Sequence, residues 1–206
     1  MAKTTFSGPV RSENGFQQVS KNATTGAITV TSGDKWATEA TASAGIEGTA
    51  AVYVTQVTRL KSDVDTNVNI VKSTIMIDLT GLKDGGTAGD IIGKDGDGVA
   101  FIGRVTTANQ GTVFGVTMTC VETPAGGSAD IDLFSATEGT GVNDTAIGDL
   151  TETQIINAGA ASAGTVVAGG DIAADQYLYL VSQGTGDATY TAGRFLIEIT
   201  GFDAAS

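Results

Sequence analysis

The chain has 206 residues, enough for one substantial domain with a buried core, and 41% of them are hydrophobic, which excludes a disordered chain. It contains no histidine and a single cysteine, which excludes Ser-His and Cys-His nucleophile pairs, an intrachain disulfide and a cysteine metal cluster. The formal net charge of −12 disfavours binding to nucleic acid or to an anionic membrane surface.

The first 25 residues are predicted to form an extended arm. They are polar, show little periodicity and include Pro9. Residues 26–206 are expected to form the folded β domain. Residues 1–6 contain no apolar core of signal-peptide length, and no later run approaches the length of a membrane span. We therefore expect the chain to stay in a cytoplasm or to be assembled there into a larger particle.

Short strands are predicted along most of the remaining sequence. Apolar side chains alternate with others in them, and Gly and Asp in the intervening turns suit the positive φ angles of tight turns. This spacing predicts an all-β fold, an antiparallel β-sandwich or jelly roll with little helix. The predicted strands are residues 27–31, 51–60, 67–79, 99–106, 112–122, 131–135, 176–182 and 194–201.

Three further expectations concern local organisation. Residues 99–105 are expected to pair with residues 113–121 as an antiparallel hairpin. A short helix is predicted at residues 150–158, because Asp149 or Thr151 is a suitable N-cap. If the domain is subdivided, the boundary is expected at residues 124–129 or in the small-residue stretch 159–170.

The loop Asp95-Gly96-Asp97-Gly98 is a candidate cation site, because alternating carboxylates in a Gly-rich loop can bind calcium. The sequence lacks the later Glu and the flanking helices of an EF-hand, and it lacks the tandem copies of a nonapeptide calcium repeat. A tight acidic turn is therefore the favoured interpretation, and we expect neither a metal nor a cofactor.

Two pairs of carboxylates, Asp130 with Asp132 and Asp63 with Asp65, have the spacing that places both on one face of a strand. Such pairs serve metal sites and glycosidases, but solvated strand edges use the same pattern. Without a supporting constellation, no catalytic residue is predicted and the chain is not expected to be an enzyme.

Two aromatic residue types have both a binding and a structural interpretation, and the single cysteine has a structural one. Tyr177 and Tyr179 lie on one face of a predicted strand and could stack on sugars, although core or subunit interface is favoured. Trp36 stands in a loop-like segment and is favoured as an anchor at a partner contact. Cys120 is expected to be a buried strand residue.

Charge is distributed unevenly along the sequence. Residues 1–104 carry ten basic and eleven acidic side chains, a net charge of −1. Residues 105–206 carry only Arg194 against twelve acidic side chains, a net charge of −11. One interpretation is a near-neutral half that contacts a partner and an acidic half that faces water. A generally acidic soluble protein is the alternative.

Several segments together resemble virion structural proteins of marine tailed phages, and the resemblance covers most of the chain. The segments are TFSGPVRSENGF (5–16), GDIIG (89–93), GVAFIG (98–103), DIDLFSATE (130–138), QYLYL (176–180) and YTAGRFLIEI (190–199). The resemblance implies a component of the virus particle. It carries no catalytic motif.

From this resemblance we expect a capsid decoration or cement protein on the outer surface of the virion. Proteins of that kind have an arm on the shell and a projecting β domain, and the chain lacks the long spine helix of common phage shell subunits. The expected partners are the major capsid protein and further copies of the chain, as a homotrimer, with no nucleic acid and no membrane. Expected capsid contacts are Phe6, Pro9, Arg11, Phe16 and Trp36. The alternative is a tail or fibre component, or a glycan-binding β-sandwich.

Overall fold

The computed structural model describes residues 18–21, 28–32, 43, 45–46, 51–60, 68–96 and 98–204. Two compact units divide the chain, Met1–Trp36 and Ala37–Ser206. In the first unit, β1 (Gln18–Lys21) pairs antiparallel with β2 (Ile28–Ser32). The boundary expected after residue 25 lies in 22–27, outside the described residues.

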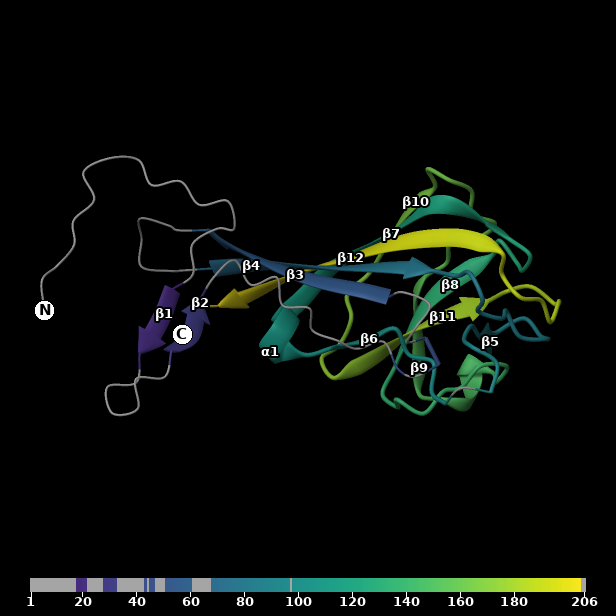
Figure 1. Cartoon of the computed structure of the whole chain (residues 1–206), viewed down its shortest axis with the longest axis horizontal. Coiled ribbons are helices and arrows are strands. Elements are labelled where there is room, and N and C mark those ends of the chain that lie inside the picture. The colour runs from purple at the N-terminus through teal and green to yellow at the C-terminus, as the bar shows by residue number, and fades with distance from the viewer. Residues whose placement is uncertain are drawn as a thin grey trace, which may run out of the picture. The chain divides into compact units, whose positions relative to one another are not determined.

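The second unit is an antiparallel β-sandwich, which confirms the predicted all-β class (Figure 1). The first sheet has the strand order β10-β7-β12-β4-β3. Its strands are β3 (Ala51–Leu60), β4 (Val68–Asp78), β7 (Thr112–Ala125), β10 (Val166–Gly169) and β12 (Ala192–Ala204). β12 is central and pairs with β4 on one side and with β7 on the other.

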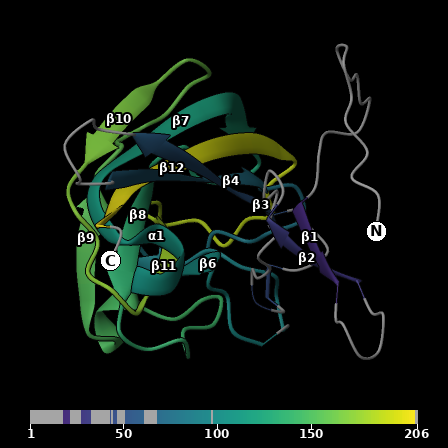
Figure 2. The same cartoon turned by 90° about the vertical axis from the view of Figure 1, so that its left-hand side faces the viewer.

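The second sheet has the order β5-β11-β8-β9, with β6 also paired to β11. Its strands are β5 (Asp90–Ile91), β6 (Gly103–Val105), β8 (Ile131–Ala136), β9 (Glu152–Ile156) and β11 (Gln176–Ser182). Figure 2 views the sandwich from one end, with the first sheet above the second. The chain changes sheet after β4, β6, β7, β9, β10 and β11, so the two sheets are built from interleaved segments.

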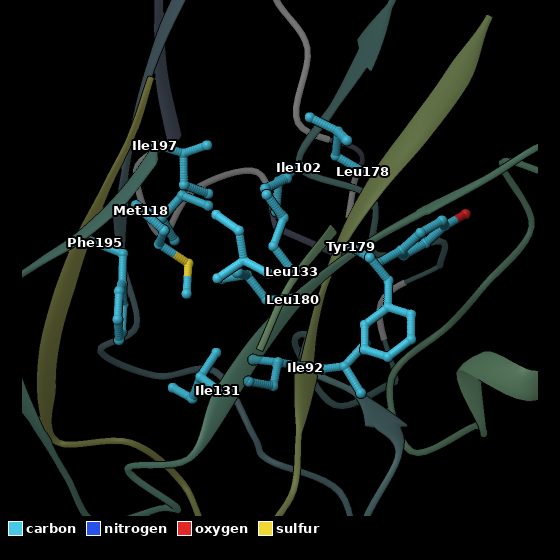
Figure 3. Close-up of a cluster of buried hydrophobic side chains, with 14 of the residues drawn as sticks. Ile92, Ile102, Met118, Ile131, Leu133, Leu178, Tyr179, Leu180, Phe195 and Ile197 are labelled. Atoms are coloured by element: carbon cyan, nitrogen blue, oxygen red, sulfur yellow. The ribbon is translucent and has the colours of Figure 1, made fainter. Parts of the chain in front are cut away.

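The core between the sheets follows from alternation along the strands. Phe195, Ile197 and Ile199 alternate with more exposed residues along β12, and all three are buried. Figure 3 shows Met118, Phe195 and Ile197 of the first sheet beside Leu133 and Leu180 of the second. These side chains belong to one hydrophobic cluster that spans both sheets. Burial of this surface is the main source of stability in such a fold.

The second sheet is also buried on its outer side. All six residues of β8 are buried, and Leu178, Tyr179, Leu180 and Val181 of β11 are buried in succession. Tyr179 lies across the sheet from the first-sheet side chains (Figure 3). A Cβ atom added to Gly141 would meet Ile91, Tyr179 and Leu150. The segments around β5 and residues 138–150 therefore cover the outer face of the second sheet.

The predicted hairpin between residues 99–105 and 113–121 is wrong. Only β6 forms within residues 99–106, and it pairs with β11, while β7 pairs with β12 and β10. Between them, α1 (Thr107–Gln110) is capped by the Thr106 side chain and ends at Gly111, whose φ is +66°. This helical turn redirects the chain from the second sheet to the first.

The predicted helix at residues 150–158 is also wrong. A short 3-10 helix lies at Ile147–Asp149, and β9 then pairs with β8. β11 pairs with one edge of β8, and β9 supplies the hydrogen-bonded neighbour at its other edge. The β-branched residues Thr153, Ile155 and Ile156 also suit a strand. Tertiary pairing thus overrides the capping signal.

Neither candidate subdivision separates the sandwich. Pro124 and Ala125 end β7, and the following turn leads into β8 across the shared core. The stretch 159–170 contains β10, which pairs with β7 at the edge of the first sheet. Both segments are connections within the unit Ala37–Ser206.

Candidate functional site

A buried carboxylate, Asp84, joins three connections between strands of the sandwich. Its side chain is 1% exposed. It accepts a hydrogen bond of 2.8 Å from the backbone N–H of Ser128 and one of 2.7 Å from that of Ala188. The three residues lie in the β4–β5, β7–β8 and β11–β12 connections. Asp84 therefore satisfies backbone donors that burial would otherwise leave unpaired.

Tyr190 reinforces this junction. Its hydroxyl donates a hydrogen bond of 3.0 Å to the carbonyl oxygen of Ser128. Burial, and after it the negative charge of Asp84, raise the pKa of Tyr190. The phenol is therefore neutral at physiological pH and acts as a structural donor.

Asp132 has a similar structural role on β8. It is 1% exposed and accepts hydrogen bonds of 2.8 Å from Gln154 Nε2 and 2.9 Å from the backbone N–H of Ala158. Gln154 belongs to β9, so the carboxylate ties β8 to β9 and to the segment that follows. The predicted pair partner, Asp130, precedes β8. Burial first, and the charge of Asp132 second, raise the pKa of Asp130.

Asp95, at the start of the candidate cation loop, forms an ion pair with Lys83, which also pairs with Asp187. Lys83 Nζ lies 3.1 Å from Asp95 and 3.2 Å from Asp187, and hydrogen bonds to these two carboxylates raise the pKa of Lys83. Gly96 and Gly98 have φ of +75° and +51°, as the predicted tight turn requires. Asp97 lies outside the described residues. Within the part of the chain that the structure describes, no three His, Cys, Asp or Glu side chains are placed to hold a metal ion.

The two tyrosines of β11 have separate environments. Tyr179 is fully buried, donates a hydrogen bond of 2.8 Å to the Glu138 carbonyl oxygen and accepts one of 3.3 Å from the Gly141 N–H. Its burial confirms the favoured core interpretation. Tyr177 is half-buried, with the Arg104 guanidinium over its ring at 5.1 Å from the centroid and the Phe101 ring at 5.0 Å.

Gly139 packs against the Tyr177 ring as well, because an added Cβ there would lie 2.7 Å from a ring carbon. Arg104 is held in place by Asp175, at 3.1 Å. The Tyr177 ring is thus engaged by side chain and backbone within the chain, an arrangement that does not favour stacking on a sugar.

Cys120 is buried in β7, as predicted. Its thiol donates a hydrogen bond of 3.3 Å to the Glu122 carbonyl oxygen, and burial raises the pKa of the thiol. Burial therefore disfavours the thiolate at neutral pH.

The remaining candidates lie outside the described residues. They are Phe6, Pro9, Arg11, Phe16, Trp36, Asp63 and Asp65.

Among the described residues of the second unit, basic side chains from the first half of the sequence pair with acidic side chains from the second half. Lys72 pairs with Glu198 across neighbouring strands β4 and β12, and Arg104 pairs with Asp175. Basic residues before residue 105 thus sit among acidic residues that follow it. The units differ in charge instead: residues 1–36 carry four basic and two acidic side chains, a net charge of +2.

An exposed aromatic pair was missed by the sequence interpretation. Phe114 is 55% exposed and Phe202 is 38% exposed, with ring centroids 6.2 Å apart. Phe114 precedes Gly115 inside a strand, and glycine within a strand is a signal for a bulge. That signal identifies the bulge but not its exposed partner on β12.

Comparison of the chain with protein-family models, with curated proteins and with solved structures finds no match. Among the described helices, none is long and apolar enough to cross a membrane.

We predict that Asp84→Ala destabilises the fold by about 3 kcal/mol, because two partly buried N–H groups lose their buried carboxylate acceptor. Urea unfolding followed by circular dichroism measures the change. Asp95→Ala is the matched control, since its ion pair with Lys83 is exposed and is worth at most about 1 kcal/mol. Equal effects of the two substitutions would show that the junction at Asp84 is not structural.

Asp130→Asn is expected to stabilise the fold at pH 7. The folded-state pKa of Asp130 is raised, so its ionisation destabilises the fold as pH rises from the ordinary aspartate pKa through the folded-state value. The stabilisation by Asp130→Asn should be complete at pH values above the folded-state pKa of Asp130 and absent at pH values below the ordinary aspartate pKa. Thermal unfolding of the variant and the parent between pH 3 and pH 7 measures this gain in stability, with melting temperatures determined to about one degree.

Asp132→Asn is the matched control and should have the opposite sign. It should cost about 2 kcal/mol at pH 7, because an amide cannot replace both acceptor oxygens. A destabilising Asp130→Asn at pH 7 would contradict the assignment.

Proposed function

We propose that the chain is a non-enzymatic virion structural protein that decorates or cements the outer surface of a tailed-phage capsid. The single observation that carries this proposal is the use of buried carboxylates as structural ties. Asp84 and Asp132 each bind a backbone N–H group of a distant segment. A body fixed in this way is suited to hold its shape on a particle under load.

The sequence resemblance supports the same proposal. Five of its segments, from residue 89 onward, contribute to the sandwich: 89–93, 98–103, 130–138, 176–180 and 190–199. They include buried residues of β8, β11 and β12. The resemblance therefore concerns the framework of the fold, which is what a structural component would share with related components.

The first unit is the proposed attachment element. Its net charge of +2 contrasts with a whole chain of −12, so it is the cationic part of an acidic protein. Phe6, Pro9, Arg11, Phe16 and Trp36 are the proposed contacts with the major capsid protein. An apolar and cationic segment can combine burial of side chains with electrostatic attraction to an acidic shell surface.

The copy number of the chain in purified virions tests the location. A decoration protein should approach the copy number of the major capsid protein, because it occupies repeated lattice positions. Quantitative mass spectrometry of virions with isotope-labelled peptides of both proteins measures the ratio. A few copies per particle would instead identify a tail or fibre component, and absence from the virion would refute a structural role.

Deletion of residues 1–36 is expected to abolish attachment to capsids while leaving the sandwich folded. The deletion removes a whole compact unit and leaves Ala37–Ser206 intact. Cosedimentation with capsids that lack the protein measures attachment, and thermal unfolding measures the fold. The triple substitution Phe6→Ser, Arg11→Ser and Phe16→Ser in the full chain should also release the protein. Full occupancy by the deleted protein would refute attachment through this unit.

A further inference from the structure

The outer face of the first sheet, the side turned away from the second sheet, carries several exposed large apolar side chains. Val166 and Thr119 are cross-strand partners, and the same row continues through Leu196 to Met76. Val166 is 62% exposed, while Leu196 and Met76 are half-buried. Figure 2 shows this sheet along one side of the sandwich, with the second sheet on its other side. We call Met76, Phe114, Val121, Val166, Leu196 and Phe202 the outer apolar face.

Two β-bulges add to this face. Thr200 and Gly201 of β12 pair with Gly115 and Val113, which leaves Phe114 as the extra residue. Arg194 and Phe195 pair with Glu122 and Cys120, which leaves Val121 as the extra residue.

Each extra residue is next to a residue of β7 whose partner on β12 faces outward. The exposed fraction is 55% for Phe114 and 48% for Val121. In a bulge the two residues that oppose one partner can share a face of the sheet. The bulges thus turn two large apolar side chains of β7 outward.

Charges on this face are nearly balanced, unlike those of the chain as a whole. Arg194 lies 3.0 Å from Asp78 and 3.6 Å from Glu122, and Lys72 pairs with Glu198. Arg194 is the single basic residue after Arg104. Two copies of a chain with net charge −12 repel each other, and this repulsion is smallest where basic and acidic groups are paired. The face therefore has the charge pattern that a self-complementary contact requires.

The size of the face suits a stable dimer. The five strands average about ten residues, from four in β10 to 14 in β7, and at a spacing of about 4.8 Å the whole sheet face measures roughly 800 Å². A standard protein interface buries about 800 Å² on each partner. Two sheets can pack face to face at about 10 Å separation, with the side chains of the facing surfaces interdigitating.

We propose that two copies of the chain pack through the outer apolar face about a two-fold axis. The same residues of both copies then form one isologous interface, with Val121 and Val166 buried between the sheets. This two-fold pairing differs from the homotrimer expected from the sequence. It belongs to the chain itself and would form in solution with or without a capsid.

Sedimentation velocity of the full chain from about 1 μM to about 100 μM tests the pairing. The wild-type chain should sediment as a dimer. Val121→Glu with Val166→Glu should be monomeric over the same range, because like charges would meet across the axis. Ala173→Glu with Ala174→Glu is the control and should stay dimeric, since both alanines are exposed in the β10–β11 connection and the added charge is the same.

Thermal unfolding verifies that each variant is folded. A milder substitution keeps the test valid if the double Glu variant does not fold. Val166→Ser alone should raise the dimer Kd at least about tenfold, since each dimer loses two buried valine side chains. A wild-type chain that is monomeric throughout, or trimeric, would overturn the proposal. So would a dimer with the same Kd in wild-type, Val166→Ser and the double Glu variant.

Discussion

Burial of the second sheet on both faces is the constraint on which the rest of the second unit depends. The first sheet covers one face, and the segments around β5 and residues 138–150 cover the other. Loops in such a position cannot leave their backbone groups to water. Asn143 Nδ2 accordingly donates to the carbonyl oxygens of Lys83 and Ile91, at 3.2 Å and 3.1 Å, and Asp144 accepts from the Gly86 N–H at 2.9 Å.

Several buried polar residues serve this constraint. Asp84 and Asp132 bind backbone N–H groups, and the hydroxyl groups of Tyr179 and Tyr190 donate to backbone carbonyl oxygens. A carboxylate held by two donors at the junction of loops is preorganised and costly to remove. Such a group contributes to a fixed shape, which is the property that the proposed role on a capsid requires.

The two faces of the first sheet have different uses. Its inner face completes the core through residues such as Ile75, Ile77 and Ile197, which are fully buried. Its outer face carries paired charges and the apolar side chains exposed by the bulges of β7. Attachment through the first unit and pairing through the sandwich would use separate parts of the chain. A particle protein that pairs in this way gains avidity, because each bound copy raises the local concentration of the next contact.

The sequence by itself determined the all-β class and most strands. Residues 51–60 and 176–182 were predicted with the boundaries observed for β3 and β11, because alternation with a period of two and flanking turn residues are local properties. The buried state of Cys120 followed from the same pattern. Only the tertiary structure decided the partners of the strands.

β6 pairs with β11 rather than β7, and residues 152–156 form a strand, since strand pairing depends on residues far apart in the chain. The same holds for the site. Asp132 accepts hydrogen bonds from donors at least 22 residues away, and Phe114 lies beside Phe202 of another strand. No local sequence pattern encodes these contacts, because they depend on segments far apart in the chain.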